Sequence, residues 1–264
     1  MDLTNRLSID TGRPIPKKFI TLDGENIVDH GITWPKKRLR IGTGHLIPKK
    51  FVPPDDETTP QHLFPAGPKY LALPPVERFI HRRTPSIFLV YTDGLCLGNG
   101  GRNPKAGCSI VFRPDEDSKG NRISSSFRFA LENKGPRNDD RPQTSNRAEL
   151  RAAIAACQFR AWTEEGFTTM VIAMDSEYVV EGITTWIDGW IRRDWKTTKG
   201  QLVKNWDLWE CLLGEIEMAD EEGLDIQFWR IPRELNTDAG HYAGLAAAEL
   251  ERNDNFTKYC GVLV

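Results

Sequence analysis

The sequence predicts an α/β fold in which helices cover both faces of a mixed five-stranded sheet. Hydrophobic runs separated by turn residues indicate strands, and apolar residues at helical spacing indicate helices. One short run is apolar throughout, which is typical of a buried parallel strand. With 264 residues and 39% hydrophobic content, the chain can form one well-filled domain of about 150–200 residues and an additional segment.

The first half of the expected domain is a meander followed by a helix and a buried strand. The three meander strands are expected at residues 87–91, 107–112 and 124–131. Residues 146–159 contain many alanines and carry apolar side chains at helical spacing, which predicts a helix. Residues 168–174 are the fully apolar strand.

The second half combines helices with one more strand. Residues 178–195 and 203–218 are predicted as helices, residues 226–231 as a strand, and residues 239–251 as the last helix. The predicted order of elements is therefore β-β-β-α-β-α-α-β-α.

The N-terminal third of the chain differs in composition from the rest. Twelve of the 17 prolines lie at or before Pro85, and no sustained period is found there, so residues 1–84 are expected to be an extended or disordered arm. The domain is expected at residues 85–252 and a tail at residues 253–264. The arm carries a charge of +5, so the remainder must carry −7 to give the total of −2. A basic arm is compatible with a polyanionic partner, although solvated charge is the commoner explanation.

The arm contains an internal repeat and a basic run. Thr11-Gly-Arg-Pro-Ile-Pro-Lys-Lys-Phe-Ile20 recurs as Thr43-Gly-His-Leu-Ile-Pro-Lys-Lys-Phe-Val52. Two copies are too few for a solenoid. The repeated unit would suit a phosphate backbone or a protein partner, and a duplicated linker is the plain alternative. Pro35-Lys-Lys-Arg-Leu-Arg40 has the density of a nuclear-import signal, but such short runs also arise by chance.

Cysteine usage and hydropathy favour an intracellular protein. The five cysteines are odd in number and include no C-x-x-C pair, so neither a disulfide framework nor a zinc site is indicated. No N-terminal apolar run resembles a signal peptide, and no 18-residue apolar stretch could span a bilayer. We therefore expect a protein of the nucleus or cytoplasm without a membrane partner, and we expect it to be a monomer.

Three acidic residues stand out because of their places on the predicted elements. Asp93 closes a hydrophobic strand, Glu149 opens a helix, and Asp175 ends a second strand. Carboxylates gathered from separate elements repel one another unless a cation lies among them, and hard oxygen ligands favour Mg²⁺ or Mn²⁺. Together the three acids suggest a metal-dependent nuclease.

Each acid also has a structural alternative when it is taken singly. Asp93 could be a turn residue before Gly94. Glu149 could complete a capping box begun by Asn146, and Asp175 could cap the next helix.

Several short motifs surround these acids in unbroken order over about residues 86–250. They are Tyr91-Thr-Asp-Gly94 with Cys96-Leu-Gly-Asn99, Asn146-Arg-Ala-Glu-Leu150, Asp175-Ser-Glu-Tyr-Val179, Gly182-Ile-Thr-Thr-Trp186, Trp195-Lys-Thr-Thr198, Val203-Lys-Asn205 and Asp207-Leu-Trp209. With these motifs the chain resembles type 1 ribonuclease H. The resemblance implies a ribonuclease H-like fold and an endonuclease that hydrolyses the RNA strand of RNA–DNA hybrids.

The resemblance also implies roles for the three acids at two Mg²⁺ ions, with Mn²⁺ as the alternative metal. Asp93 would bridge both ions. Glu149 would hold the ion on the leaving-group side and help to position the 2′-hydroxyl, while Asp175 would anchor the ion that activates water. Two divalent ions about 4 Å apart make a water nucleophilic and neutralise the leaving alkoxide.

The fourth carboxylate of the family is where this chain departs from the pattern. Family members carry an Asp four residues after the Asn that opens the last helix, whereas here Gly240 follows Asn236 at that spacing. Asp238 is a candidate replacement, but it lies two residues earlier, about 200° away on a helix, so the helix start would have to shift. His241 is either a proton-transfer residue or an ordinary surface residue. Turnover is therefore expected to be reduced, redirected toward Mn²⁺, or absent.

The same resemblance implies which residues bind the substrate. Asn99, Asn146 and Glu177 match positions that contact the minor groove of the hybrid, where 2′-hydroxyls distinguish RNA from DNA. Glu177 replaces the family's usual Gln, and so exchanges an amide that can donate for a carboxylate that only accepts. Thr144 matches a residue that grips a phosphate of the DNA strand.

Tryptophans and cations are interleaved before the second predicted helix of this region. Trp195, Lys196 and Lys204 resemble the family's basic protrusion, which holds the DNA strand in a salt-dependent manner. Trp186 and Trp190 lie at helical spacing and are expected to pack partly in the core.

Two functions therefore remain open. The first is cleavage of the RNA strand of RNA–DNA hybrids, and the second is hybrid binding by a module that has kept the fold and lost turnover. Gly240 is the feature that divides them. Another nuclease or an integrase of the same fold is a third option, which the protrusion and Asn146-Arg147 argue against.

Overall fold

The computed structural model describes residues 40–55, 57–69, 76–115 and 125–260. Its strands are β1 (Lys49–Lys50), β2 (Ala66–Lys69), β3 (Val76–Ile80), β4 (Ile87–Leu97), β5 (Lys105–Val111), β6 (Ser126–Ala130), β7 (Thr169–Met174) and β8 (Asp225–Arg230). In the described part they form one eight-stranded mixed sheet in the order β1-β8-β7-β4-β3-β2, and β5 pairs with both β4 and β6.

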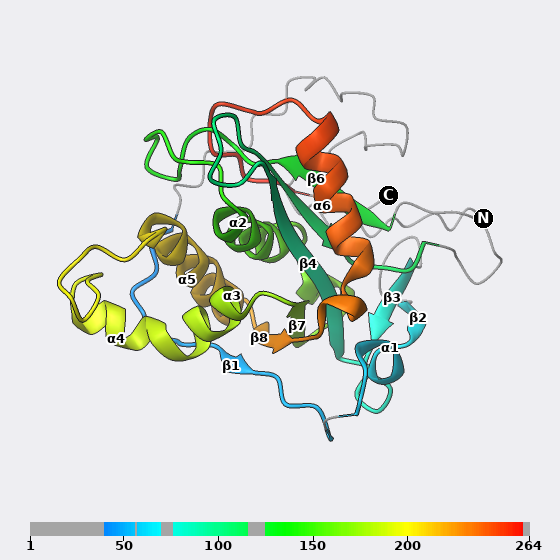
Figure 1. Ribbon diagram of the computed structural model, residues 1–264. Coiled ribbons are helices and arrows are strands. Elements are labelled where there is room, and N and C mark those ends of the chain that lie inside the picture. The colour runs from blue at the N-terminus through cyan, green and yellow to red at the C-terminus, as the bar shows by residue number, and fades with distance from the viewer. Residues whose placement is uncertain (1–39, 56, 70–75, 116–124, 261–264) are drawn as a thin grey trace, which may run out of the picture.

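Helices cover both faces of this sheet (Figure 1). They are α1 (Pro60–Leu63), α2 (Ser145–Gln158), α3 (Glu177–Glu181), α4 (Ile187–Arg192), α5 (Trp206–Glu221) and α6 (Thr237–Glu249), with short 3₁₀ turns at Trp162–Glu165 and Arg233–Leu235. None of the helices in the described part is both long and apolar enough to cross a membrane.

Alternation of side chains along β4 separates two hydrophobic cores. Phe88 and Val90 belong to the larger core, which also contains the buried faces of α2 and α5. Leu89 and Tyr91 point to the opposite face and join the smaller core, which contains Ala239 of α6. The central strand is thus buried on both sides, which explains its nearly continuous hydrophobic sequence.

The five strands expected from the sequence are β4 to β8, and the predicted order of elements is confirmed. β4 runs antiparallel to β5 and parallel to β7, and β7 runs parallel to β8. The predicted helix at residues 178–195 is interrupted by a π-helical segment, Gly182–Trp186. Of its two tryptophans, Trp190 packs against the core, whereas Trp186 is 39% exposed.

Three further strands correct the expectation of a five-stranded sheet. β1 pairs in parallel with the outer edge of β8, while β2 and β3 form a hairpin that pairs with the first half of β4. Residues 40–55, 57–69 and 76–84 are therefore largely built into the domain, although they were expected to be an extended or disordered arm. These strands were missed because they are only two to five residues long, and segments this short carry no clear period. Residues 1–39 of the expected arm lie outside the described part.

The first half of the expected tail packs on the domain. The Asn253 and Asp254 carbonyls accept hydrogen bonds from the backbone amides of residues 133 and 134. Arg151 is fully buried and forms an ion pair with Glu132. Its guanidinium lies 4.4 Å from the ring centroid of Phe256, so the tail closes over a buried cation.

Candidate active site

Asp93 lies inside β4, on the face of the sheet that α6 covers. Its cross-strand partner is Ser109 of β5, whose hydroxyl donates to the Ala239 carbonyl of α6 at 2.6 Å. The Asp93 carboxylate accepts a hydrogen bond from the Gly94 amide at 2.7 Å. Burial and then the negative charge of Asp175 raise the pKa of Asp93 to about 6. Asp93 is therefore an internal strand residue, and neither closes the strand nor begins a turn.

Gly94 allows the helix that carries Glu149 to approach β4. A Cβ atom at Gly94 would lie 2.0 Å from the Glu149 amide nitrogen and 2.1 Å from the Ala148 carbonyl carbon. Contacts this short do not occur, so only glycine permits this packing. Successive residues of a strand face opposite sides of the sheet. Asp93 therefore places its own carboxylate on one face, while Gly94, on the other, positions Glu149 by letting α2 approach.

Glu149 is held by the residue that follows Asp175. The Ser176 hydroxyl donates to Glu149 Oε2 at 2.6 Å and accepts from the Val179 amide at 3.3 Å. Burial raises the pKa of Glu149 to about 7, opposed by the Ser176 hydrogen bond and reinforced by the charges of Asp93 and Asp175. Near neutral pH the Glu149 carboxyl is thus partly protonated.

The helix caps are not the residues that the sequence suggested. Thr144 caps α2 by accepting a backbone amide at 3.3 Å, and Ser176 caps α3. Asn146 lies inside α2 and begins no capping box with Glu149. Asp175 is likewise not the cap of α3. The carboxylates of Glu149 and Asp175 are therefore both available for contacts other than capping.

Asp175 follows the last residue of β7 and is oriented by a buried amide. Asn236 Nδ2 donates to Asp175 Oδ1 and to the Thr92 carbonyl, each at 3.1 Å. Asn236 is 3% exposed and stands immediately before α6. One side chain therefore fixes the end of β7, the centre of β4 and the start of α6 relative to one another.

The three carboxylates interact through their charges. Asp93 and Asp175 both raise the pKa of Glu149, while the cation of Arg233 lowers the pKa of Asp93 and of Glu149. Among the described residues, no group of three or more His, Cys, Asp or Glu side chains is arranged to hold one metal ion. The donor chemistry suits a hard divalent cation, because such an ion stabilises half-buried carboxylates that repel one another. A shared three-carboxylate site requires these side chains to move closer.

Gly240 lies at this cluster, and Asp238 does not take its place. A Cβ atom added at Gly240 would lie 3.1 Å from Asp93 Oδ2. Asp238 is exposed in the first turn of α6, and its charge acts on Tyr91, whose pKa is raised by burial and then by Asp238. His241 is exposed beside the ring of the next residue. The helix therefore presents Gly240 to Asp93.

The residues expected to contact the hybrid lie at exposed ends of these elements. Asn99 is in the turn after β4, and Asn146 is in the first turn of α2. Glu177 is exposed in the first turn of α3 and pairs with Arg230 of β8 at 2.8 Å. The Thr144 hydroxyl, which accepts the capping hydrogen bond, still has a proton to donate.

The expected basic protrusion is a tight turn between α4 and α5. A β-bridge joins Lys196 to Leu202 across it. Lys196 and Lys204 are exposed, whereas Trp195 is half-buried and packs against the larger core. Only the two lysines therefore present their side chains fully to solvent.

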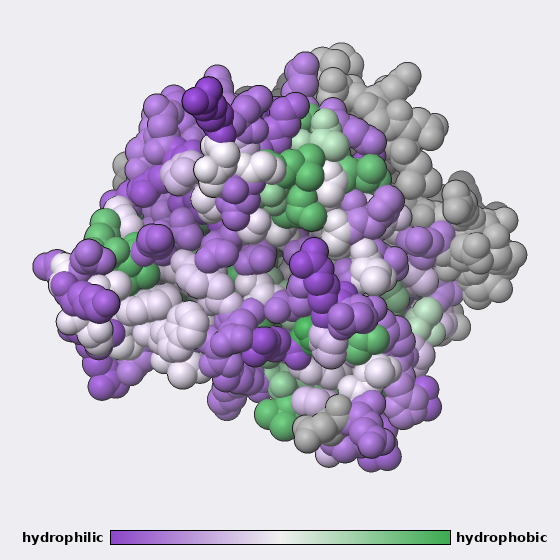
Figure 2. All heavy atoms as spheres, viewed as in Figure 1, coloured by the Kyte–Doolittle hydropathy of each residue, from purple (hydrophilic) through white to green (hydrophobic). Residues whose placement is uncertain are grey.

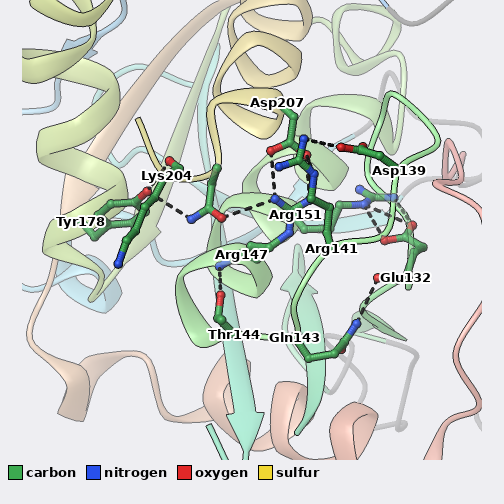
Figure 3. Close-up of polar contacts among 11 residues, drawn as sticks. Glu132, Asp139, Arg141, Gln143, Thr144, Arg147, Arg151, Tyr178, Lys204 and Asp207 are labelled. Atoms are coloured by element: carbon green, nitrogen blue, oxygen red, sulfur yellow. Dashed lines mark hydrogen bonds and ion pairs between the residues drawn. The ribbon is translucent and has the colours of Figure 1, made fainter. Parts of the chain in front are cut away.

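A buried network ties the base of this protrusion to α2 (Figure 3). Arg147 of α2 donates two hydrogen bonds to Asp207 of α5, at 2.9 and 2.8 Å. Asn205 accepts from Arg147 at 3.4 Å and donates to the Tyr178 hydroxyl at 3.2 Å. That hydroxyl donates to the Lys204 carbonyl at 3.1 Å. These contacts fix the protrusion relative to the helix that carries Glu149.

Sequence reasoning did not identify several residues that organise the site. Ser176 and Arg147 lie inside motifs that were singled out because of neighbouring acidic or asparagine residues. The position of Asn236 was recognised, but its hydrogen bond to Asp175 was not foreseen. Arg233 lies in the short segment between β8 and α6, and it was not considered in the sequence analysis. The signals were present, but each contact joins elements far apart in the chain.

The face of the molecule that α6 covers is mostly hydrophilic. In the view of Figure 2, hydrophobic atoms form small, separate patches among polar ones. Scattered patches of this kind are normal for a protein surface and indicate no large apolar interface on this side. This face is therefore suited to ligands held by charge and hydrogen bonds.

Comparison with known proteins agrees with the topology and the motifs. The family model described as RNase H matches residues 85–221, about half of the chain. Human Ribonuclease H1 is 31% identical over 179 residues, which cover 68% of this chain and 52% of the relative. Ribonuclease H of Edwardsiella ictaluri is 38% identical over 123 residues, covering 47% of this chain and 66% of the relative. Ribonuclease H of Erwinia tasmaniensis is 34% identical over 164 residues, covering 62% and 86%.

The chain thus spans about half of its human relative and most of the Erwinia protein. The matched family segment begins just before β4 and ends with α5, so it includes Asp93, Glu149 and Asp175. The chain belongs to the ribonuclease H family.

Proposed function

We propose that this protein is a metal-dependent endonuclease that hydrolyses the RNA strand of RNA–DNA hybrids. The carrying observation is that Asp93, Glu149 and Asp175 come from β4, α2 and the end of β7, and that the charge of Asp175 raises the pKa of both Asp93 and Glu149. The RNase H family model matches residues 85–221, which include these elements, and relatives named ribonuclease H support the same reaction. Half-buried carboxylates that repel one another at an otherwise polar face are what a cation-dependent hydrolase requires.

The metal proposed is Mg²⁺, with Mn²⁺ as the alternative, because the family generally uses a divalent metal. Asp93, Glu149 and Asp175 would hold it. When bound, two such ions would supply a nucleophilic water and neutralise the leaving alkoxide. The protein's own contribution is orientation: Ser176 fixes a Glu149 oxygen, and Asn236 fixes an Asp175 oxygen.

Recognition of the hybrid is proposed for two separate surfaces. Asn99, Asn146 and Glu177 would read the minor groove, where the 2′-hydroxyl identifies the RNA strand. Thr144 would hold a DNA phosphate, and the protrusion with Trp195, Lys196 and Lys204 would hold the DNA strand further along. Contacts of the lysines should weaken as salt rises, because they displace counterions.

A second candidate function is hybrid binding with little or no turnover, and the position of Gly240 favours it. Gly240 faces Asp93 at a place where an additional carboxylate would reach the same cluster. With one ligand fewer, a bound cation is held by fewer charges and its affinity falls. Hybrid binding through the exposed residues would be unaffected.

Cleavage of a labelled RNA–DNA hybrid by the full chain separates the two candidates. We expect cleavage in Mg²⁺ or Mn²⁺, no cleavage of double-stranded DNA, and loss of cleavage in Asp175→Asn. Asp188→Asn is the matched control, because Asp188 is an exposed acid on α4 that pairs with Arg192. Equal inactivity of wild type and Asp175→Asn, with both still binding the hybrid, would establish the binding module instead.

Asp238 and His241, which were also predicted as catalytic, are tested with the same substrate. Both are exposed on α6. A loss of cleavage in Asp238→Asn or His241→Ala, with hybrid binding kept, would assign that residue to proton transfer or metal binding. Unchanged cleavage in both variants would remove them from the site.

A further inference from the structure

The second copy of the internal repeat, residues 43–52, is bound along the domain in a specific manner. Buried Glu217 of α5 accepts hydrogen bonds from the Thr43 amide at 2.9 Å and from the Gly44 amide at 2.7 Å. The Thr43 hydroxyl donates to the same carboxylate at 3.1 Å, and His45 lies 3.2 Å from it. A buried carboxylate is thus satisfied by the first residues of the repeat.

The second half of this copy adds β1 to the edge of the sheet (Figure 1). Lys49 and Lys50 pair with β8, and the Phe51 amide donates to the Phe228 carbonyl at 2.8 Å. The Lys50 ammonium lies 2.6 Å from the Glu181 carboxylate of α3. The Phe51 ring packs 5.0 Å from the ring of Trp229. We call the surface formed by Glu217, Glu181 and the β8 edge at residues 227–229 the repeat-docking surface.

The first copy of the repeat, residues 11–20, carries the side chains that these contacts use. Thr11, Gly12, Lys18 and Phe19 stand where Thr43, Gly44, Lys50 and Phe51 stand in the second copy. The pairing of β1 with β8 uses backbone groups only, so it makes little demand on the side chains. Both copies also carry a proline immediately before the two lysines.

Glycine is required at the second position of the repeat, and both copies have it. Gly44 has φ of +78°, and a Cβ there would lie 2.4 Å from the Ile191 side chain. The positive φ disfavours any residue with a side chain here, whereas the contact with the end of the Ile191 side chain could be relieved by a small shift of that side chain. Retention of Gly12 in the first copy is what a second docking-competent segment needs.

The differences between the copies are also compatible with docking. Arg13 replaces His45 and would place a permanent cation beside the Glu217 carboxylate. Pro14 replaces Leu46, whose amide makes no hydrogen bond among the described residues, so no hydrogen bond is lost. Position 52 is the least demanding, because Val52 is 80% exposed.

We propose that the first copy docks on the repeat-docking surface of its own chain when the second copy leaves it. Both copies cannot occupy the surface together. Docking of the first copy would release residues 21–52 as a loop, including the basic run at residues 35–40. Arg40, the last cation of that run, is held by Glu221 of α5 while the second copy is docked. The exchange would therefore free a cationic segment for a polyanionic partner.

Two features explain why the second copy is the one docked in the structure. Gly42, just before it, packs so tightly that a Cβ would lie 2.2 Å from the Leu213 side chain, and the corresponding residue of the first copy is Asp10. The first copy must also close a loop of the 32 residues 21–52, and loop closure carries an entropic penalty. The first copy is thus the weaker of two occupants.

Hydrogen exchange in the full chain tests the proposal. In one variant residues 43–51 are replaced by a Gly-Ser segment of equal length, in a second residues 11–19 are replaced, and in a third both are replaced. We expect the first variant to slow exchange of the amides within residues 12–19 by about tenfold or more, because docked backbone is protected. The second variant should match wild type in the exchange of the amides within residues 43–51.

Thermal unfolding of the same variants gives an independent readout. The variant that keeps only the first copy should unfold at a higher temperature than the variant with neither. Equal unfolding temperatures, together with exchange in residues 12–19 that is no slower than in wild type, would overturn the proposal. It would also be overturned if the first variant dimerised as its protection appeared, because the occupant would then be a neighbouring chain.

Discussion

At the scale of single residues, the carboxyls of Asp93 and Glu149 set how stability depends on pH. Burial and the nearby charge of Asp175 raise their pKa values to about 6 and about 7, from ordinary values of 3.8 and 4.5, and the charge of Asp93 adds to the rise for Glu149. At pH values between the ordinary and the raised pKa of these groups, the folded chain binds more protons than the unfolded chain. Without a divalent cation, the free energy of unfolding should therefore fall as the pH rises from about 4 to about 7.

Glu149→Gln removes part of this penalty. At pH 8 in a chelator we expect the variant to be more stable than wild type by about 1–2 kcal/mol, and at pH 4 to show no such gain. Gln can still accept the Ser176 hydrogen bond, so packing is kept. Urea unfolding at both pH values measures the difference, with the exposed Glu177→Gln as the control. A destabilised Glu149→Gln at pH 8 would contradict the assigned pKa direction.

Gly240→Asp tests the proposal that a carboxylate at residue 240 would complete the cluster, and Gly240→Asn provides the same size without the charge. In a chelator at pH 8, the Asp variant should be less stable than the Asn variant by about 1 kcal/mol, because its charge joins that of Asp93. In Mg²⁺ that difference should shrink or reverse, and the metal concentration needed for cleavage should fall. Identical behaviour of the two variants in both conditions would show that residue 240 does not reach the cluster.

At the scale of elements, the link between α2 and α5 holds the protrusion in place. Arg147 and Asp207 are both buried, and their side chains form a two-point ion pair. Removing one partner leaves the other as an unpaired buried charge, so Asp207→Leu should reduce the free energy of unfolding by about 3–5 kcal/mol. The double variant Arg147→Met/Asp207→Leu should lose less than the sum of its single variants. A double-mutant cycle in urea measures this, and additive losses would show that the pair is not coupled.

The elements also show what the sequence can and cannot predict. β4 and β7 were found because buried strands in the sheet centre need continuous apolar runs. β1 was missed because its two residues are exposed lysines that pair only through backbone groups. The π-helical segment Gly182–Trp186 was missed because its hydrophobic spacing still resembles an α-helix.

The residues of the candidate site likewise include some that the sequence could predict and some that it could not. Asp93, Glu149 and Asp175 could be proposed as site residues because each lies in a motif at the expected end or start of an element that periodicity can place. Their partners Ser176 and Asn236 act through hydrogen bonds between elements, and such contacts have no local pattern. Residues that carry charge into a site are therefore easier to predict than residues that orient them.

At the scale of the whole molecule, the site depends on elements that only folding brings together. β4, α2, the end of β7 and α6 are distributed over more than half of the chain, and the unfolded chain has no preformed cluster of their carboxylates. Ligands that bind only the folded state stabilise it by mass action. A divalent cation should therefore protect the whole domain against unfolding, apart from any effect on cleavage.

The size and pH dependence of that protection can be stated. At pH 8 and a Mg²⁺ concentration about 100 times the dissociation constant, the free energy of unfolding should rise by about 2.7 kcal/mol. At pH 5 the gain should be much smaller, because Asp93 and Glu149 are then largely protonated and cannot serve as ligands. NaCl at matched ionic strength controls for screening, and Asp175→Asn controls for cation binding elsewhere. An equal rise in that variant would place the stabilising cation outside the carboxylate cluster.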